Sequence, residues 1–527
     1  MGVAHRLLTT LRSSLFTIYD SRFTIHDSRF SLADYKSESL TMSKRILRLV
    51  SLLALASLVT AVLVLNSSFG VRAQRARAIK KEVANTAARN TAIIETTSAV
   101  LKETSEIREL PVRRPVKSGA ESRADIERML IRNLDKQTTP ADMRATELAL
   151  RKFGLVGSTF QYRPFIIKLL TEQVAGYYDT RAQQFYLADW LDLEGQKPVM
   201  SHELAHALQD QHFNLRRFEK WPKGDSDAEL AAHALIEGDA TLAMTFYMVR
   251  NPLVALAFRR SLGAGGISTE QYDQAPRAIR ESLIFPYLNG AEWATQLYKR
   301  GGWKTITAAY ARLPLSTEQI LHPDKYFSYK RPVKMVLPDV AGLLNASSQQ
   351  TAISSQPKRR GAGRPPASSA RAGRQARKRS PASPRPHQVF AWRRIDSDVN
   401  GEWSYYLLLD QFLNSATESK RAAAGWGGDR YDVYEGPGGQ VFLAQLTAWD
   451  TENDAREFYD AYIKRTRQRY ADEKELDTDS QSEGQSLSAW ETGEGAVVIQ
   501  LRGSRVAILE GIPAGINHHA LLKAIAH

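Results

Sequence analysis

Hydrophobic residues recur at helical spacing through the first half of the chain. Between residues 123 and 151 they fall three and four positions apart, as at Ile126 and Met129, which is the period of an amphipathic helix. Thr139 followed by Pro140 is a helix-start signal inside this stretch. We therefore predict two consecutive helices here.

Two longer helices and a hairpin are predicted after them. Residues 174–178 and 184–187 are rich in β-forming side chains and flank a turn-forming stretch, which indicates a β-hairpin. Pro198 is expected to open a helix that reaches about Gln211, and a long helical pattern runs from 226 past 247. The first half is therefore expected to be mostly helical with a small hairpin or sheet.

The last 140 residues show a different pattern. It predicts a helix at 403–413, a hairpin of 431–435 with 440–446 around Gly-Pro-Gly-Gly, a helix capped by Asp450 or Thr451 that reaches about Arg469, and a hairpin of 497–502 with 505–510. The whole chain is accordingly predicted to be α+β, with a mostly helical domain followed by a smaller α+β domain.

Length and charge divide the chain further. It has 527 residues, enough for two or three domains, and a net charge of +14. Ten Lys or Arg and no acid lie in the Pro/Ser/Arg-rich run 346–387, which leaves only +4 for the other 485 residues. Most of the excess positive charge therefore lies in a predicted disordered linker rather than on a folded surface, and we expect no specific nucleic-acid partner.

The start of the chain has the pattern of an export signal. Lys44 and Arg45 precede the apolar run 46–65, and Val71-Arg72-Ala73 is a small-residue cleavage pattern. Residues 1–41, which contain a seven-residue repeat, are expected to be non-native or disordered. We predict a protein exported to the cell envelope or secreted, with possible anchoring in the membrane through 46–65. The predicted units are 1–41 extension, 42–73 signal or anchor, 74–109 spacer, 110–345 mostly helical domain, 346–387 linker and 388–527 C-terminal domain.

The stretch His202-Glu203-x-x-His206 carries the clearest chemical signal. The chain has no cysteine, so any metal ion must be held by His and carboxylate ligands. On a helix, positions four apart differ by about 40°, so both imidazoles can reach one ion. Glu203, beside the first histidine, is the candidate general base that takes a proton from water.

A catalytic zinc ion needs a third protein ligand and one position left for water. His212 fits the pattern H-E-x-x-H-x-x-G-x-x-H except that Gln209 replaces the glycine. Without that turn, His212 would lie about 240° round the helix from His206. We favour Glu237, 31 residues beyond His206 on the next helix and followed by small residues that suit close packing. His233, four residues before it, is an alternative ligand or a partner of one.

The motifs resemble a known class of enzyme. HELAH at 202–206 followed by EGDA at 237–240 resembles the gluzincin type of zinc metallopeptidase. With GYYD at 176–179 and STEQILHPDKY at 316–326, the chain is similar to an exported bacterial family of zinc-dependent peptidases. The resemblance covers about residues 110–326 and extends to GWGGDRY at 425–431.

This resemblance implies a zincin-like catalytic domain with one Zn²⁺ ion on His202, His206 and Glu237, and Glu203 as base. Thermolysin-like enzymes also carry an Asp four residues after the glutamate ligand, which orients a histidine. This chain has Thr241 at that position, and Asp239 lies two residues after the glutamate.

The expected reaction is therefore hydrolysis of a peptide or protein substrate. A hydrogen-bond donor must also meet the developing oxyanion. His322 in Leu-His-Pro is our candidate for this second catalytic role, and Tyr177 and Tyr178 are alternatives. Either strand of the predicted hairpin could pair with an extended substrate. The competing hypothesis is a catalytically silent envelope protein that keeps the zincin-like fold as a binding scaffold.

Overall fold

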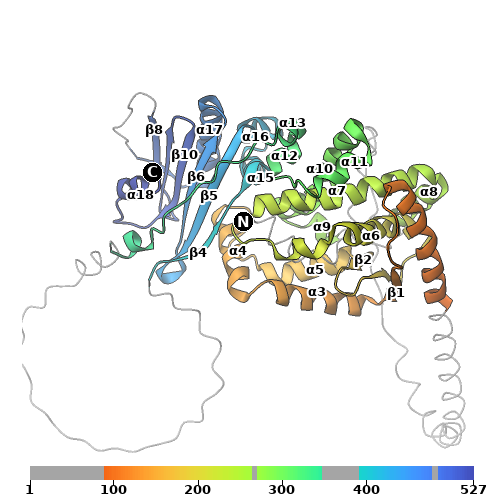
Figure 1. The fold of residues 1–527 in the computed structure, drawn as a ribbon. Helices are drawn as coiled ribbons and strands as arrows, with labels where there is room; N and C mark the ends of the chain where they lie inside the picture. The colour runs from red at the N-terminus through yellow and green to blue at the C-terminus, as the bar shows by residue number, and fades with distance from the viewer. Residues whose placement is uncertain (1–87, 264–269, 347–390, 477–484, 527) are drawn as a thin grey trace, which may run out of the picture.

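Two regions of different secondary structure make up the computed structural model, which describes residues 88–263, 270–346, 391–476 and 485–526 (Figure 1). The first is mostly helical with a small three-stranded sheet, and the second is built on a seven-stranded antiparallel sheet. The predicted α+β fold is thus confirmed. The predicted extension at 1–41, the signal segment at 42–73 and residues 347–387 of the predicted linker lie outside the described residues.

The helical region begins with a helix over residues 88–108. The elements after it are β1 (Lys117–Glu121), α3 (Arg123–Gln137), α4 (Pro140–Lys152), α5 (Tyr162–Gln173), β2 (Gly176–Asp179), β3 (Gln184–Ala188), α6 (Leu193–Phe213), η1 (Leu215–Lys220), α7 (Ser226–Arg250), α8 (Pro252–Gly263), α9 (Glu270–Asp273), α10 (Arg277–Gly301), α11 (Trp303–Ala309), α12 (Thr317–Leu321) and α13 (Pro323–Ser328).

Capping side chains account for the two helices α3 and α4. Thr139 accepts a hydrogen bond from the backbone N–H of Asp142, whose carboxylate in turn accepts one from the N–H of Thr139. Pro140 occupies the first turn, where its missing N–H costs nothing. The predicted pair of helices with a boundary at this Thr-Pro step is confirmed.

Helix α6 starts earlier than the sequence predicts. The expected start was Pro198, but the helix begins at Leu193, and Asp192 caps it by accepting a hydrogen bond from the N–H of Gly195 at 2.8 Å. Pro198 lies inside the helix, where it removes the hydrogen bond to the carbonyl of Glu194 in the first turn. The capping aspartate therefore sets the boundary, and the helix tolerates the proline.

Side chains of the first helix join the core. Ile93, Val100 and Leu101 are buried and pack in one hydrophobic cluster with Met200 and Leu204 of α6. The predicted spacer, residues 74–109, therefore contributes to the packing of α6 from residue 88 onward.

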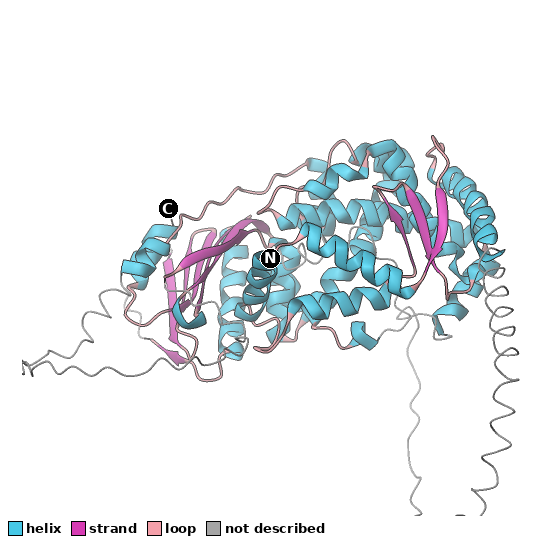
Figure 2. Cartoon of the chain, turned by 90° about the horizontal axis from the view of Figure 1, so that it is seen from below, coloured by secondary structure: helices cyan, strands magenta, loops and turns pink. Residues whose placement is uncertain are grey.

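The small sheet contains the predicted hairpin and one further strand. Strands β2 and β3 pair antiparallel, as expected, and β1 pairs with β3 in parallel, which gives the order β1-β3-β2. Strand β2 thus lies at an edge of the sheet and packs against α6. Figure 2 shows this sheet and the seven-stranded sheet far apart, with helices between them.

Helices α7 and α10 approach each other closely at two glycines. A Cβ atom added to Gly238 would lie 2.2 Å from the carbonyl carbon and oxygen of Gly290, and one added to Gly290 would lie 2.3 Å from the carbonyl oxygen of Ala234. Only residues without a side chain fit at this crossing. The small residues that follow Glu237 in sequence therefore serve close helix packing, as predicted.

The C-terminal region contains one sheet of strand order β4-β5-β6-β10-β9-β8-β7, in which each pair of neighbours is antiparallel. Both predicted hairpins, the predicted helix at 403–413 and the cap at Thr451 are present. The elements are β4 (Arg393–Asp398), α15 (Gly401–Leu413), α16 (Ala416–Ala423), β5 (Trp426–Glu435), η2 (Pro437–Gly439), β6 (Val441–Trp449), α17 (Glu452–Arg469), β7 (Lys474–Glu475), β8 (Gln485–Glu491), β9 (Ala496–Arg502), β10 (Arg505–Ile512) and α18 (His518–Ile525).

The two regions share a continuous hydrophobic core. Phe285 of α10 contacts Trp403 of α15 with ring centroids 4.6 Å apart. At the start of α7, the backbone N–H of Ser226 donates to Asp398 at 2.9 Å, and both residues are buried. We call this contact surface between the two regions the seam. It fixes the start of the helix that carries Glu237.

Among the described residues, no single helix has the length and apolar composition needed to cross a membrane. Helix α7 and residues 252–261 of α8 meet the criterion only when they are taken together, across a bend of 114°.

We expect the substitution Gly238→Ala to lower the free energy of unfolding by about 1–3 kcal/mol, because α7 and α10 must separate to accommodate the methyl group. Urea unfolding followed by circular dichroism measures this change. The control is Gly342→Ala, where an added Cβ meets no atom within 4 Å. Equal stability of the two variants would contradict the close-packing interpretation.

Candidate metal centre

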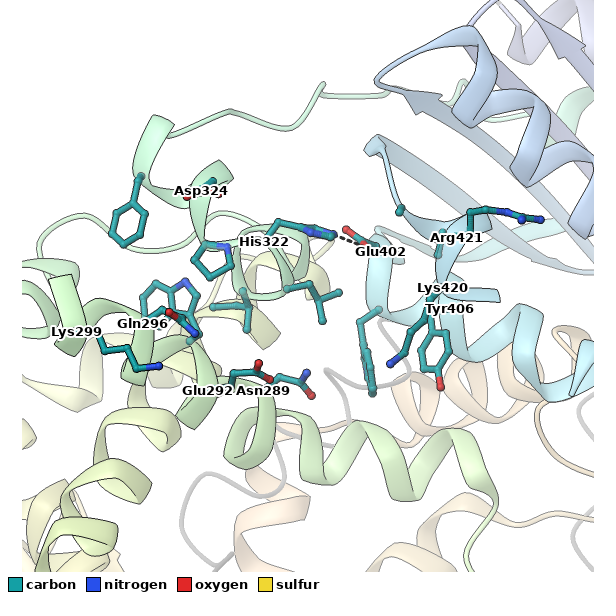
Figure 3. A pocket seen from close by; sticks show the side chains of 18 of the residues that line it. Asn289, Glu292, Gln296, Lys299, His322, Asp324, Glu402, Tyr406, Lys420 and Arg421 are labelled. Atoms are coloured by element: carbon teal, nitrogen blue, oxygen red, sulfur yellow. Dashed lines mark hydrogen bonds and ion pairs between the residues drawn. The ribbon is translucent and has the colours of Figure 1, made fainter. Parts of the chain in front are cut away.

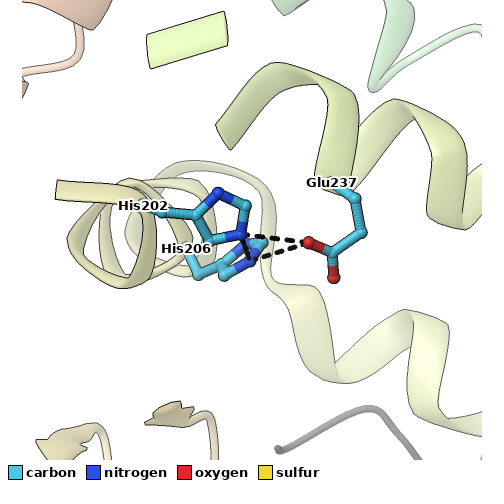
Figure 4. A group of neighbouring side chains, drawn as sticks. All are labelled: His202, His206 and Glu237. Atoms are coloured by element: carbon cyan, nitrogen blue, oxygen red, sulfur yellow. Dashed lines mark hydrogen bonds and ion pairs between the residues drawn. The ribbon is translucent and has the colours of Figure 1, made fainter. Parts of the chain in front are cut away.

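Two adjacent helices place three potential metal ligands together (Figure 4). His202 and His206 project from the same face of α6, and their Nε2 atoms lie 2.9 Å apart. Glu237 of α7 reaches both, with its Oε2 atom 3.1 Å from His202 Nε2 and 3.2 Å from His206 Nε2. The three predicted ligands therefore converge on one point, and the group could hold a metal ion.

The triangle of donor atoms has the size that a small divalent cation requires. In a tetrahedral site with metal–ligand distances of about 2.1 Å, the ligand atoms lie about 3.4 Å apart. The three observed separations are a few tenths of an ångström shorter. Both histidines are buried, and the side chain of Glu237 is only 18% exposed. Two imidazoles and one carboxylate leave a fourth position for a further ligand.

Gln209 fixes the tautomer of His206. Its side-chain N–H groups donate to the carbonyl of Ile236 at 3.0 Å and to Asp239 at 3.1 Å, and both of these groups can only accept. The amide oxygen of Gln209 must therefore face His206 Nδ1, 2.9 Å away, and accept its proton. This arrangement leaves the lone pair of Nε2 directed at the metal position.

Asp239 holds that glutamine in place. Its buried carboxylate also pairs with both Nε and Nη2 of Arg108, at 2.5 and 3.1 Å, and accepts the hydroxyl proton of Tyr310 at 2.8 Å. Thermolysin-like enzymes carry an orienting aspartate four residues after the glutamate ligand. In this chain the aspartate two residues after it acts on His206 through Gln209.

The carboxylate of Glu203 faces the edge strand of the small sheet. It accepts a hydrogen bond from the backbone N–H of Tyr178 at 2.9 Å. Burial raises the pKa of Glu203 to about 8, against the opposing effect of His206. A carboxyl with a pKa in this range can both accept and return a proton near neutral pH, as general acid–base chemistry requires.

Without a metal ion, the charges of the ligands compensate one another. Burial, and then the proximity of His206, lowers the pKa of His202 to about 3. Burial opposes the charge on His206 and on Glu237, but their mutual attraction prevails and moves the pKa of His206 up to about 9 and that of Glu237 down to about 2. A cation is therefore favoured between these two side chains, as a proton or as a metal ion.

Tyr287 of α10 is a site residue that the sequence analysis missed. Its ring lies beside His202, with centroids 6.0 Å apart, and its hydroxyl forms a hydrogen bond with Glu237. Burial, and then the charges of Glu237 and Glu203, hold its pKa well above the usual value, so the hydroxyl remains a donor. The sequence gives no signal for it, because its position depends on the glycine crossing of α7 and α10.

The alternative ligands lie elsewhere. His212 is near the end of α6, and its Nε2 atom is 2.7 Å from the carbonyl oxygen of Pro111. Asn214 ends the helix in a left-handed conformation two residues later, so the chain does not turn back before His212. His233 is buried on α7 but is not part of the group formed by His202, His206 and Glu237.

His322 lines a pocket between the two regions, where it faces Glu402 (Figure 3). Its Nε2 atom is 2.8 Å from Glu402 across the seam, and the hydrogen bond raises its pKa. Both residues line a cavity of about 900 Å³, which Asn289 of α10 also lines. Residues two apart on a helix differ by about 200°, so Asn289 and Tyr287 lie on opposite faces of α10. Helix α10 therefore separates His322 from the metal centre.

The two tyrosines considered as oxyanion donors are engaged with carboxylates. The hydroxyl of Tyr177 donates to Glu121 at 2.8 Å, and that of Tyr178 donates to Asp210 at 3.0 Å. Tyr178 contacts the site through its backbone N–H.

Comparison with known proteins gives one match. The profile of a family described as a domain of unknown function (DUF8575) matches residues 388–519, which lie in the C-terminal region and do not include the metal ligands. No curated protein and no solved structure matches the chain.

Removal of Glu237 tests the ligand set. We expect Glu237→Ala to abolish stoichiometric zinc binding, because two histidines alone hold the ion weakly, whereas His212→Ala should retain it. Elemental analysis of the purified variants after dialysis measures the metal content. Zinc loss in His212→Ala but not in Glu237→Ala would establish a different third ligand.

Gln209→Ala tests the orienting contact on His206. We expect the zinc affinity to fall by about 10–100-fold while the folded structure persists, because the ring loses the partner that fixes its tautomer. Competition with a chromogenic chelator gives the affinity, and Gln211→Ala on the same helix is the control. Unchanged affinity in Gln209→Ala would show that the glutamine only fills space.

Proposed function

We propose that the chain is a zinc-dependent metallopeptidase. The observation that carries the proposal is the convergence of His202, His206 and Glu237, with the carboxylate of Glu203 one residue from the first ligand. Two imidazoles and a carboxylate with a free fourth position are the ligand set of catalytic zinc rather than of structural zinc. A zinc ion held there would supply the Lewis acid that polarises a carbonyl group and makes water more acidic.

Each protein group has a defined part in the proposed reaction. Glu203 accepts a proton from the attacking water and delivers it to the leaving amine, which its raised pKa supports. The hydroxyl of Tyr287 is hydrogen-bonded to the ligand Glu237 itself, whereas those of Tyr177 and Tyr178 are hydrogen-bonded to carboxylates outside the ligand group, so Tyr287 is our candidate to stabilise the developing oxyanion. Gln209 keeps His206 oriented.

Strand β2 offers a place for an extended substrate. It is at the edge of its sheet, and the N–H of Tyr178 points to Glu203 instead of pairing with β3. Residues 176–178 are buried and the outward N–H of Tyr178 is hydrogen-bonded to Glu203, so a peptide that pairs with this edge must displace the carboxylate from that N–H. Its backbone would then lie next to the base and the metal position. This geometry favours cleavage within an unstructured stretch of polypeptide, and hence an endopeptidase.

The sequence pattern at 42–73 supports export, so the proposed place of action is the cell envelope or the outside of the cell. The alternative is a protein that holds zinc without cleaving peptides and acts through the C-terminal region. The burial of both histidines is compatible with that alternative.

Glu203→Gln tests the proposed base. We expect at least a hundredfold loss of hydrolysis of an unfolded protein such as casein, with about the same zinc content, because an amide cannot accept the proton. The control is Glu194→Gln, an exposed residue on the same helix. Hydrolysis is followed by fluorescence release from labelled casein.

Two results would contradict the peptidase proposal. Full activity in Glu203→Gln would show that another group is the base. A wild-type chain that binds one zinc ion and cleaves no peptide in a broad library would favour the scaffold.

A further inference from the structure

The outer face of helix α8 exposes large apolar side chains. Most large hydrophobic residues of the described chain are buried, yet Leu253 is 82% exposed, Val249 at the end of α7 is 74% exposed and Leu256 is 45% exposed. The three lie within eight residues, on either side of the bend between α7 and α8. Scattered single residues of this kind need no explanation, but Leu253 and Leu256 are three residues apart on one helix and form a group.

The fold does not need these side chains. The opposite face of α8 provides the packing, where Phe258 is buried and Val254 contacts the cluster that contains Val100 and Leu101. Leu253 and Leu256 are one turn apart on the other face, so both can enter the same apolar environment. Polar residues at these two positions would leave the core intact.

The outer face of α8 also carries two positively charged side chains. Arg259 and Arg260 are exposed and follow Leu256 by about one turn. Neither makes an ion pair within the described part of the chain, whereas Arg250 pairs with Glu103 and Glu106. The outer face is therefore apolar at its start and positively charged at its end, a combination that suits the interface of an anionic bilayer.

The first described helix, residues 88–108, lies near α8. At the start of α8, Asn251 donates a hydrogen bond to Glu103 at 2.6 Å. At the end of α8, Ser261 lies close to Gly195. Four residues before Gly195, the carbonyl of Leu191 accepts a hydrogen bond from Arg89. Residues near both ends of α8 therefore lie close to the helix over 88–108 or to residues that it contacts.

The described chain therefore begins next to the charged end of α8, and the apolar run 46–65 precedes it. Residues 66–87 can span at most about 75 Å. A connection of this length allows α8 to contact the bilayer but does not require the contact.

We propose that the outer face of α8, formed by Leu253, Leu256, Arg259 and Arg260, binds the surface of an anionic phospholipid bilayer. The apolar side chains enter the interface, and the two guanidinium groups pair with phosphates of the headgroups. The interaction would hold the metal centre at a fixed orientation to the membrane. It does not depend on the peptidase proposal.

The absence of cysteine makes a direct test simple. The full-length chain with Leu256→Cys is labelled with an environment-sensitive fluorophore and reconstituted in vesicles of phosphatidylcholine with phosphatidylglycerol. We expect lipid-borne bromine to quench this label at least about threefold more than a label at Val336→Cys, which is 79% exposed in another part of the chain. Equal quenching at the two positions would overturn the proposal.

The arginines are tested separately. In anionic vesicles, the double substitution Arg259→Gln with Arg260→Gln should reduce the quenched population about fivefold per arginine. With both arginines present, vesicles of pure phosphatidylcholine should give the same reduction. Quenching that is unaffected by the arginine substitutions and by the removal of anionic lipid would overturn the anionic-lipid assignment. A blue-shifted label that bromine does not quench and that depends on protein concentration would instead identify a second copy of the chain as the partner.

Discussion

The buried carboxylate of Asp239 accepts hydrogen bonds from three segments that are far apart in sequence. Arg108 comes from the first helix, Gln209 from α6 and Tyr310 from the residue after α11. A buried charge without partners is strongly unfavourable, so these segments must assemble together for the fold to form. Because Gln209 also holds His206, the same constraint that closes the core directs a ligand at the metal position. The assembly of the core and the orientation of His206 are therefore coupled through a single side chain.

Close helix packing is the second condition for the site. Gly238 and Gly290 let α10 approach α7 until their backbones touch, which brings Tyr287 to the side of His202. Neither glycine contributes a side chain to the site. Because they lack a Cβ atom, the two helices can approach each other closely. The site therefore consists of ligands on α6 and α7 together with a wall supplied by α10.

Local patterns in the sequence were sufficient for much of this arrangement. The spacing of His202 and His206 determines that both face one side of a helix, and the small residues after Glu237 indicate the close neighbour that α7 has. The start of α6 was misplaced, because a proline inside a helix and a proline at its start look alike in sequence. Strand β1 and Tyr287 were missed because their positions depend on tertiary contacts. Gln209 was noticed only as a missing glycine, and its role follows from Asp239, thirty residues away.

The seam has a consequence for the integrity of the molecule. Buried contacts such as Ser226 with Asp398 and Phe285 with Trp403 join the two regions, and these contacts lie outside the peptide connection between residues 346 and 391. A chain cleaved in that connection should persist as a tight complex of two fragments, in which the start of α7 keeps its contact with Asp398. Separately produced halves would then be suited to split-protein reconstitution, and fragments that reunite would recover the metal ligands together.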